Sequence, residues 1–552
     1  MGETKTLDGI TYAKMLRAGA AKLNEHVQEI NNLNVFPIPD GDTGDNMFLT
    51  LLGGTDALKD APADLGAASK MAADGMLLCA RGNSGVILSQ IFAGIAKGFE
   101  GMQQADLFAV GKALKSGIKC AYSAVMEPTE GTILTVYREA AEYACVCAGR
   151  SMEEMLSGFI EKGRKTLEKT PEMLCVLKKA GVVDSGGAGL LYIAEGMKKG
   201  LGGETEGTAP GAFIPHSMNL DLDLFREDSV LEFGYCTECL LRLQSSKTDP
   251  ESFDTDIITD HLKSIGNSVV CVKTGSIVKL HVHTMVPGEV MNFCQKYGEF
   301  LKVKVENMSL QHSDSVHANA DALPQKLVPE KHKRYGIVEV ASGEGIKKAF
   351  AERGADFVID GGAGMNPSTQ DFLEAFGRIL ADVIFVFPND PNVIMAARQA
   401  ADFYKGADVK VVESRSIGEG YMALLMFDDG PKDEKEVLEN IYSSMEGVAT
   451  ARISRCIRNV SGAGRNIRAG EYIGFVSDEI LSAAENRGEA AKGLIERLGA
   501  KDYDVAIIFY GKDANEEEAG EIKQALLKAN RYMEVYTIFG GQDIYDEIII
   551  LQ

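Results

Sequence analysis

The sequence predicts a multidomain protein with an all-α N-terminal domain, an α+β middle domain and an α/β C-terminal domain. Apolar residues recur at helical spacing over residues 7–201, strands with alternating apolar residues lie within 222–311, and short apolar strands alternate with helical segments over 335–552. Two polar stretches without periodicity, 202–221 and 312–334, separate these domains as linkers.

The composition is that of a soluble globular chain of 552 residues, which is long enough for three or four domains. The net charge of −23 argues against nucleic acid as a partner, because phosphates require a basic face. The N-terminus carries no apolar signal segment, and no apolar run is long enough to span a bilayer. The ten cysteines show no framework spacing. We therefore expect a cytoplasmic protein with reduced thiols.

The stretch from Asn34 to Met47 is predicted to be a loop that carries carboxylates. Two prolines end the preceding helical pattern, and two glycines permit a tight backbone path. Asp40 and Asp42 are separated by one glycine, so both can reach one hard cation, as magnesium sites that also hold phosphates require. The alternative is a solvated turn, in which Asp-Gly-Asp is ordinary chemistry.

Three further segments rich in Gly, Ser and Thr each open a predicted helix: 81–85, 129–132 and 184–189. Free backbone amides at the start of a helix bind anions. One acidic loop together with three such helix starts predicts a site for nucleotide phosphates and magnesium.

These motifs resemble the kinase domain that dihydroxyacetone kinases share with the A subunit, the catalytic subunit, of bacterial fatty acid kinase. The resemblance covers about residues 7–201, and Asn-Val-Phe-Pro-Ile-Pro-Asp-Gly-Asp-Thr-Gly is similar to the fatty acid kinase branch specifically. It implies an antiparallel barrel of helices that holds ATP at one end. No Gly-Lys-Ser/Thr phosphate loop is present in the sequence, and this family needs none.

The resemblance also implies roles for individual residues. Asp40 and Asp42 match catalytic ligands of magnesium, of which two ions are expected. Asn34 is the candidate third ligand, near a place where dihydroxyacetone kinases carry an aspartate. Asp45 is interpreted as a helix cap, and a role as a metal ligand is the alternative. The implied nucleotide-binding residues are Thr43, Gly44, Asn46, Gly82, Asn83, Ser84, Gly85, Thr132, Asp184 and Gly186.

A zinc site is predicted in the middle domain. Alternate residues of the strand 276–283 are apolar, which leaves His281 and His283 on one face, where they can share a metal. Cys236 is the candidate third ligand, and a set of one cysteine and two histidines suits zinc, whereas Cys239 points the opposite way. Surface histidines on a half-exposed strand are the alternative. Gly-Tyr-Cys-Thr-Glu and His-Val-His-Thr resemble the family's middle domain and favour a structural zinc.

The C-terminal region 335–552 is predicted to contain β/α units and a largely parallel sheet. Ligands of such sheets bind at the loops that follow the strands, although loops rich in Gly and Ser are also simply loops. Here these loops are 342–345, 361–369, 388–390 and 416–420. Met-Asn-Pro-Ser-Thr and Phe-Gly-Gly-Gln-Asp-Ile-Tyr resemble the C-terminal part of the fatty acid kinase A subunit. The region looks similar in architecture to the fatty-acid-binding proteins that this kinase serves.

The resemblance implies a kinase that transfers phosphate from ATP to a fatty acid, which a separate fatty-acid-binding carrier protein holds, for phospholipid synthesis. Two alternatives stay open: a kinase for a small hydroxyl substrate such as dihydroxyacetone, and a non-catalytic ligand-sensing scaffold. We expect no acyl tunnel in the helical domain, because periodicity uses up its apolar positions, and we expect the carrier to dock on 335–552. A homodimer is compatible with the sequence.

Overall fold

The computed structural model describes the chain except for residues 1–4, 34–40, 147–150, 203–234, 245–246, 249–252, 275–276, 308–331, 363 and 429–432. The predicted linkers lie almost entirely outside the described residues. The chain divides into two compact units, of which one combines Met1–Gly211 with Pro329–Gln552 and the other is Ala212–Val328. The helical domain and the C-terminal region therefore belong to one unit.

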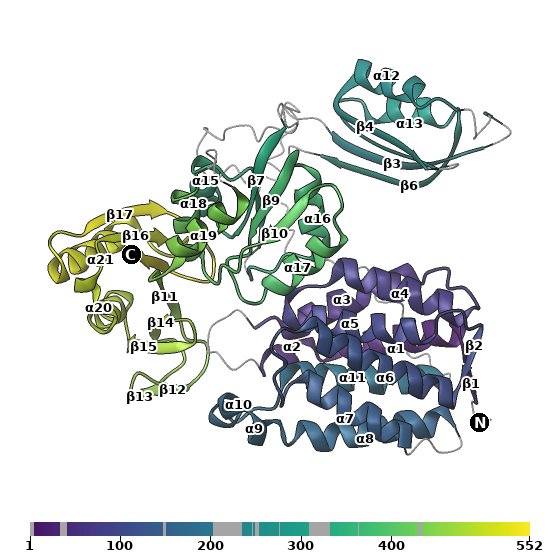
Figure 1. Ribbon diagram of the computed structural model, residues 1–552, viewed down its shortest axis with the longest axis horizontal. Helices are drawn as coiled ribbons and strands as arrows, with labels where there is room; N and C mark the ends of the chain where they lie inside the picture. The colour runs from purple at the N-terminus through teal and green to yellow at the C-terminus, as the bar shows by residue number, and fades with distance from the viewer. Residues whose placement is uncertain are drawn as a thin grey trace, which may run out of the picture. The chain divides into compact units, whose positions relative to one another are not determined.

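The N-terminal domain is helical, as predicted, and its long helices lie side by side (Figure 1). One short antiparallel ribbon, β1 (Thr6–Asp8) with β2 (Gln104–Asp106), corrects the prediction that the domain is all-α. The helices are α1 (Gly9–Glu25), α2 (Val27–Asn31), α3 (Thr43–Ala57), α4 (Leu65–Cys79), α5 (Gly82–Gly98), α6 (Leu107–Ala124), α7 (Ile133–Val146), α8 (Met152–Leu167), α9 (Thr170–Met173), α10 (Cys175–Ala180) and α11 (Ser185–Leu201).

Side-chain caps fix where several of these helices begin. Asp8, Asp106 and Asp184 each accept a hydrogen bond from the backbone N–H three residues further along, at 2.8, 2.8 and 2.7 Å. Each such cap contributes about 1 kcal/mol to stability. Glycine lets α5 and α6 approach closely, because a Cβ atom on Gly94 would lie 2.6 Å from the Cα atom of Gly117.

The C-terminal region begins with a parallel sheet of strand order β10-β9-β7-β8, which confirms the predicted β/α units. Its strands are β7 (Lys333–Ala341), β8 (Phe357–Asp360), β9 (Ala381–Phe387) and β10 (Asp408–Val411). The accompanying helices are α15 (Glu344–Glu352), α16 (Thr369–Gly377), α17 (Ile394–Phe403), α18 (Ile417–Leu425) and α19 (Glu434–Met445).

A second sheet is formed by strands between residues 449 and 551, and with its helices it confirms that the last part of the chain is α/β, as predicted. Its order is β15-β14-β11-β18-β16-β17, and only the pairing of β16 with β17 is parallel. The strands are β11 (Ala449–Arg455), β14 (Tyr472–Val476), β15 (Glu479–Ala484), β16 (Val505–Tyr510), β17 (Glu534–Phe539) and β18 (Glu547–Leu551). The remaining elements are the ribbon of β12 (Val460–Gly462) and β13 (Arg465–Ile467), the short helix η2 (Ala500–Asp502), and the helices α20 (Arg487–Leu498) and α21 (Glu516–Ala529).

In its described residues the middle unit has one antiparallel sheet of order β4-β5-β3-β6 with two helices, as expected of an α+β domain. Val278, Leu280 and Val282 are fully buried, which confirms that they form the core face of their strand. The elements are β3 (Tyr235–Leu243), α12 (Asp256–Ile265), β4 (Gly266–Thr274), β5 (Ile277–Thr284), α13 (Pro287–Cys294) and β6 (Gly298–Asn307).

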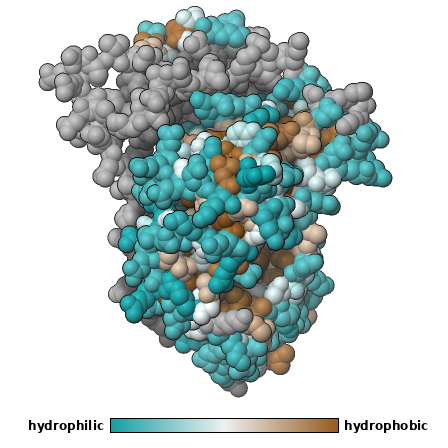
Figure 2. Space-filling view, turned by 90° about the vertical axis from the view of Figure 1, so that its left-hand side faces the viewer, coloured by the Kyte–Doolittle hydropathy of each residue, from teal (hydrophilic) through white to brown (hydrophobic). Residues whose placement is uncertain are grey.

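Hydrophilic side chains cover most of the face seen in Figure 2, and hydrophobic side chains are interspersed among them. Among the described helices, none is both long and apolar enough to cross a membrane.

Candidate functional site

The predicted phosphate-binding segments meet at one end of the helical domain. Ser185 at the start of α11 donates a hydrogen bond from its Oγ to Oγ1 of Thr43 at the start of α3, at 3.3 Å. Gly186, at the same start of α11, lies against Ile133, because a Cβ atom on it would be 3.2 Å from the Cβ atom of Ile133. The starts of α3, α7 and α11 are therefore neighbours, although they are far apart in the sequence.

The acidic loop ends at Asp42, which is the residue before α3 and makes no side-chain cap to it. Its carboxylate accepts a hydrogen bond at 2.6 Å from Nδ2 of Asn366. Asp45 is not a cap, which corrects that interpretation: it lies in the first turn of α3, and its Oδ2 accepts from Nδ2 of Asn31 at 2.7 Å. Asn34 and Asp40 lie outside the described residues, so their roles as ligands stay predictions.

The pKa of Asp42 is raised to about 6, chiefly by burial, and the negative charges of Asp390 and Asp45 contribute to this rise. A hydrogen bond from Asn46 works in the opposite direction and lowers it. A bound cation favours the ionised form of a carboxylate. In the absence of a cation, the site therefore holds a carboxylate whose charge is only poorly compensated.

The first turn of α5 lies against the side-chain amides of Asn46 and Asn366. Gly82 has a φ of +54°, and a Cβ atom there would lie 2.6 Å from Nδ2 of Asn46 and 3.4 Å from Oδ1 of Asn366. Only glycine fits this position without displacing the amides. Asn83 donates from Nδ2 to Oδ1 of Asn392 at 3.0 Å.

Two of the glycines that were predicted to bind the nucleotide make contacts within the helical domain instead. Gly85 packs α5 against α3, because a Cβ atom on it would lie 2.4 Å from Oγ1 of Thr50. The backbone N–H of Gly44 donates to Oδ1 of Asn31 at 2.7 Å. Ser84, which follows Asn83 in the first turn of α5, is half-buried.

Thr132 and Asp184 lie at the starts of α7 and α11. Oγ1 of Thr132 donates to the carbonyl oxygen of Thr129 at 2.8 Å. Asp184 caps α11 through Gly187, and its pKa is raised to about 6 by burial, while the backbone N–H groups of Gly187 and Ile133 lower it. The Asp184 carboxylate therefore joins the starts of two helices.

Sequence reasoning did not assign the residues that the C-terminal region contributes. Asn366 lies in the loop after β8 and contacts Asp42. Asn392 and Asp390 lie in the loop after β9: Asn392 contacts Asn83, and the charge of Asp390 acts on Asp42. The rule that ligands of parallel sheets bind at the loops after the strands identified these loops as candidates, but it does not identify individual side chains within them.

The residues present fit a hard cation with a nucleotide. Carboxylate and amide oxygens are the ligands that magnesium takes. Oδ2 of Asp42 and Oδ1 of Asn46 both accept a hydrogen bond from Nδ2 of Asn366, which brings one oxygen of each kind together. Oδ1 of Asn83 and Oδ1 of Asn366 are buried acceptors without a donor among the described residues. Within that part of the chain no cluster of three or more His, Cys, Asp or Glu side chains could hold a metal, so Asp40 would have to contribute.

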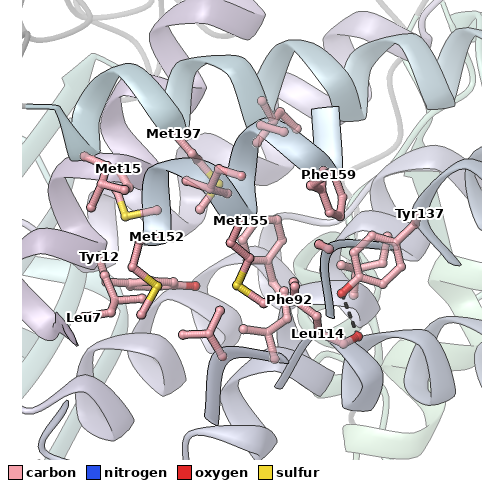
Figure 3. Close-up of a pocket in the computed structure, with 18 of the residues that line it drawn as sticks. Leu7, Tyr12, Met15, Phe92, Leu114, Tyr137, Met152, Met155, Phe159 and Met197 are labelled. Atoms are coloured by element: carbon pink, nitrogen blue, oxygen red, sulfur yellow. Dashed lines mark hydrogen bonds between the residues drawn. The ribbon is translucent and has the colours of Figure 1, made fainter. Parts of the chain in front are cut away.

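An apolar cavity lies inside the helical domain, between α1, α5, α6, α7, α8 and α11 (Figure 3). Its presence corrects the expectation that helical periodicity uses up all apolar positions. Its volume is about 90 Å³, which is less than the roughly 150 Å³ of a cavity that holds one benzene molecule. An acyl chain therefore does not fit it as it stands. The lining includes Met15, Met152, Met155, Met197, Phe92 and Phe159.

The pairing of β3 with β5 places Cys236 opposite His283, and Glu238 opposite His281. The side chains of Cys236, His281 and His283 lie outside what the structure describes, so the zinc site stays a prediction. Cys239 is buried in the core of this domain, as its predicted orientation requires.

The raised pKa of Asp42 gives a prediction for stability. Above about pH 6 the carboxylate is ionised in both the folded and the unfolded protein, and the cost of burying its charge destabilises the folded state. Below about pH 4 the carboxyl group is protonated in both states, and this cost disappears. In EDTA, Asp42→Asn should therefore raise the free energy of unfolding by about 1 to 2 kcal/mol at pH 7.5 and change it little at pH 4, since the side chain is only half-buried.

Urea unfolding at several pH values measures this difference. Asp56→Asn, at the exposed end of α3, is the matched control and should leave stability almost unchanged. A variant Asp42→Asn that is less stable than the natural protein at pH 7.5 would contradict the buried-charge account.

Comparison with known proteins identifies related families and chains. The model of the DAK2 domain matches residues 37–199, that of the FakA-like middle domain of fatty acid kinase matches 232–315, and that of the FakA-like C-terminal domain matches 336–552. Protein YloV of Bacillus subtilis is 38% identical over 558 residues, which cover 99% of each chain. An uncharacterized protein of Staphylococcus epidermidis is 36% identical over 548 residues and covers 98% of each chain.

Among solved structures, DegV of Bacillus subtilis, a fatty acid binding protein, is similar to 40% of this chain over 99% of its own length. The two are 10% identical with a TM-score of 0.30, which is too low to bear on fold or function. The expected likeness of 335–552 to fatty-acid-binding proteins therefore stays a prediction.

Proposed function

Because this chain belongs to the FakA-like family of fatty acid kinase proteins, we propose that it transfers the γ-phosphoryl group of ATP to the carboxylate of a fatty acid held by a separate carrier protein. The observation that supports this most is the meeting of three helix starts and the Asp42 carboxylate at one end of the helical domain. Helix starts bind phosphate oxygens, and a carboxylate beside them can hold the cation that accompanies a nucleotide.

The reaction places few demands on the protein. An oxygen of the fatty acid carboxylate bonds to the γ-phosphorus, the bond from that phosphorus to the β–γ bridging oxygen breaks, and ADP leaves with that electron pair. A carboxylic acid is already ionised at neutral pH, so no base has to remove a proton. A hydroxyl acceptor such as dihydroxyacetone would need one. The carboxyl acceptor therefore suits a site that positions phosphates and neutralises charge.

The residues of this chain would divide the work as follows. Asp42 and Asp40 would hold magnesium, which when bound would neutralise charge on the phosphate oxygens. The first turns of α3, α5 and α7, with Thr43, Ser84 and Thr132, would orient the triphosphate through backbone N–H groups and hydroxyls. The cap at Asp184 would hold the starts of α7 and α11 in place.

The fatty acid is proposed to arrive on a carrier because the helical domain offers it too little room. The apolar cavity there is smaller than a benzene-binding cavity, and its lining carries almost no polar atoms to meet a carboxylate. The C-terminal region 335–552 is the proposed docking region for the carrier.

The test is nucleotide turnover by the full chain with magnesium and ATP in three arms: oleate on a fatty-acid-binding carrier, dihydroxyacetone, and no acceptor. We expect ADP formation with carrier-bound oleate only. Turnover with dihydroxyacetone would support the hydroxyl kinase instead. Absence of turnover in all three arms, with nucleotide bound, would support a ligand-sensing protein.

We also propose that Cys236, His281 and His283 bind one zinc ion with a structural role. Cys236 lies opposite His283 on adjacent antiparallel strands, where side chains on one face are neighbours. Metal analysis of the purified protein should find about one zinc per chain, and none in a His281→Ala/His283→Ala double variant. His261→Ala, whose ring stacks on Phe293 in the same domain, is the control and should keep the zinc. Zinc that stays in the double variant would exclude these ligands.

A further inference from the structure

Asn366 of the C-terminal region contacts the acidic loop of the helical domain directly. Its Nδ2 donates to Oδ2 of Asp42 at 2.6 Å and also to Oδ1 of Asn46. We propose that Asn366 belongs to the magnesium–nucleotide site and turns its side-chain oxygen toward the cation when the cation is bound. This inference rests on the proposed function, since it concerns the same site, and it gives the C-terminal region a part in nucleotide binding.

The loop that carries Asn366 is held firmly by other groups. The backbone N–H of Asn366 donates to the carbonyl oxygen of Gly361 at 2.7 Å and closes the loop. Ser368 caps α16 in a capping box with Asp371. Thr369 then donates its backbone N–H to the carbonyl oxygen of Ala80, between α4 and α5, at 3.1 Å. The position of Asn366 over the acidic loop is thus set by its neighbours.

The contact between the two domains does not depend on the Asn366 side chain. Nε2 of Gln399 donates to the carbonyl oxygen of Leu77 at 2.7 Å, and Nε2 of Gln90 donates to Oε1 of Gln399 at 3.1 Å. Ala80 and Val86 are buried in one apolar cluster with Phe372 and other side chains of the parallel sheet and its helices. The Asn366 amide is therefore available for a role in the site.

The side-chain oxygen of Asn366 would be better satisfied with a cation bound than it is without one. Its Oδ1 is buried and has no donor among the described residues, which is costly for a polar atom. Exchange of the amide nitrogen and oxygen by rotation would place Oδ1 beside the Asp42 carboxylate. Two oxygens there repel each other unless a cation lies between them. With a cation bound, both oxygens become ligands and the unsatisfied acceptor is removed.

The surroundings favour positive charge. Asp390 lies in the loop after β9, two residues before Asn392, which accepts a hydrogen bond from Nδ2 of Asn83 in the first turn of α5 at 3.0 Å. The C-terminal region thus adds a carboxylate as well as an amide oxygen to this end of the helical domain. A divalent cation is the partner that such a set of oxygens binds.

The test measures manganese binding to the full chain in the presence of the non-hydrolysable analogue β,γ-imido-ATP, by the electron paramagnetic resonance signal of free manganese. Asn366→Ala should weaken manganese binding by about tenfold or more, as loss of a ligand or its immediate support does. Asn366→Asp keeps an oxygen and adds charge, so its affinity should equal or exceed that of the natural protein. Gln90→Ala loses only an interdomain hydrogen bond and should change affinity less than about twofold.

Three results would overturn the inference: unchanged or tighter binding in Asn366→Ala, equal loss in Gln90→Ala, or no recovery in Asn366→Asp. If Asn366→Ala does not fold, Asn366→Asp decides the matter alone. If the natural protein binds no manganese with the analogue, the proposed function fails. If it binds and the Asn366 variants match it, only this inference fails.

Discussion

Replacing Asp42 with alanine is expected to lower the rate of phosphoryl transfer by about a thousandfold or more and to leave the helical fold intact. The variant removes a carboxylate proposed to hold magnesium at the point where α3, α5 and the Asn366 loop meet. Loss of that charge neutralisation costs several kcal/mol in the barrier, and each 1.4 kcal/mol is about tenfold in rate. Asp40→Ala should have the same effect.

Initial rates with carrier-bound oleate measure this, and circular dichroism checks the fold. Asp56→Ala, in the last turn of the same helix, is the control, because its side chain is exposed and forms a surface ion pair with Lys59. That control should keep near-normal activity. Near-normal turnover by Asp42→Ala would remove the metal assignment.

Free oleate is expected to react at least about a hundredfold more slowly than oleate bound to a carrier, at equal total concentration. The reason is positioning: a held carboxylate is presented to the γ-phosphate, whereas a free acid must be captured from solution by a domain whose apolar cavity measures only about 90 Å³.

Steady-state rates at matched concentrations, below the level at which free oleate forms micelles, give the comparison. A carrier loaded with no fatty acid controls for activation by the carrier protein itself. Efficient phosphorylation of free oleate without any carrier would refute the division of labour between the two proteins.

Local patterns predicted the helical domain well. Apolar residues at helical spacing predict helices over residues 152–167 and 516–529. The structure has helices over Met152–Leu167 and Glu516–Ala529, and each combines an apolar face with a Ser or Asn cap at its start. The strand β18 was missed, although it lies between β11 and β16. It is a short apolar run at the chain end, and its pairing partners are far away in the sequence, so nothing local identifies it.

The candidate site was predicted only in part, for a related physical reason. Motif spacing marked the loops at Asp42, Gly82 and Asp184, which the structure brings to one end of the domain. It could not tell which glycine serves packing and which lies at the site. It could not find Asn366 either, because Asn366 and Asp42 are 324 positions apart and meet only through the fold.

The proposed activity is tested most directly by trapping the product. The full chain is incubated with magnesium, ATP and carrier-bound oleate, and hydroxylamine converts any acyl phosphate to a stable acyl hydroxamate. The account predicts one hydroxamate for each ADP formed, and none when ATP, magnesium or carrier is left out. Formation of ADP without hydroxamate, under conditions where a chemically made acyl phosphate is trapped, would contradict it.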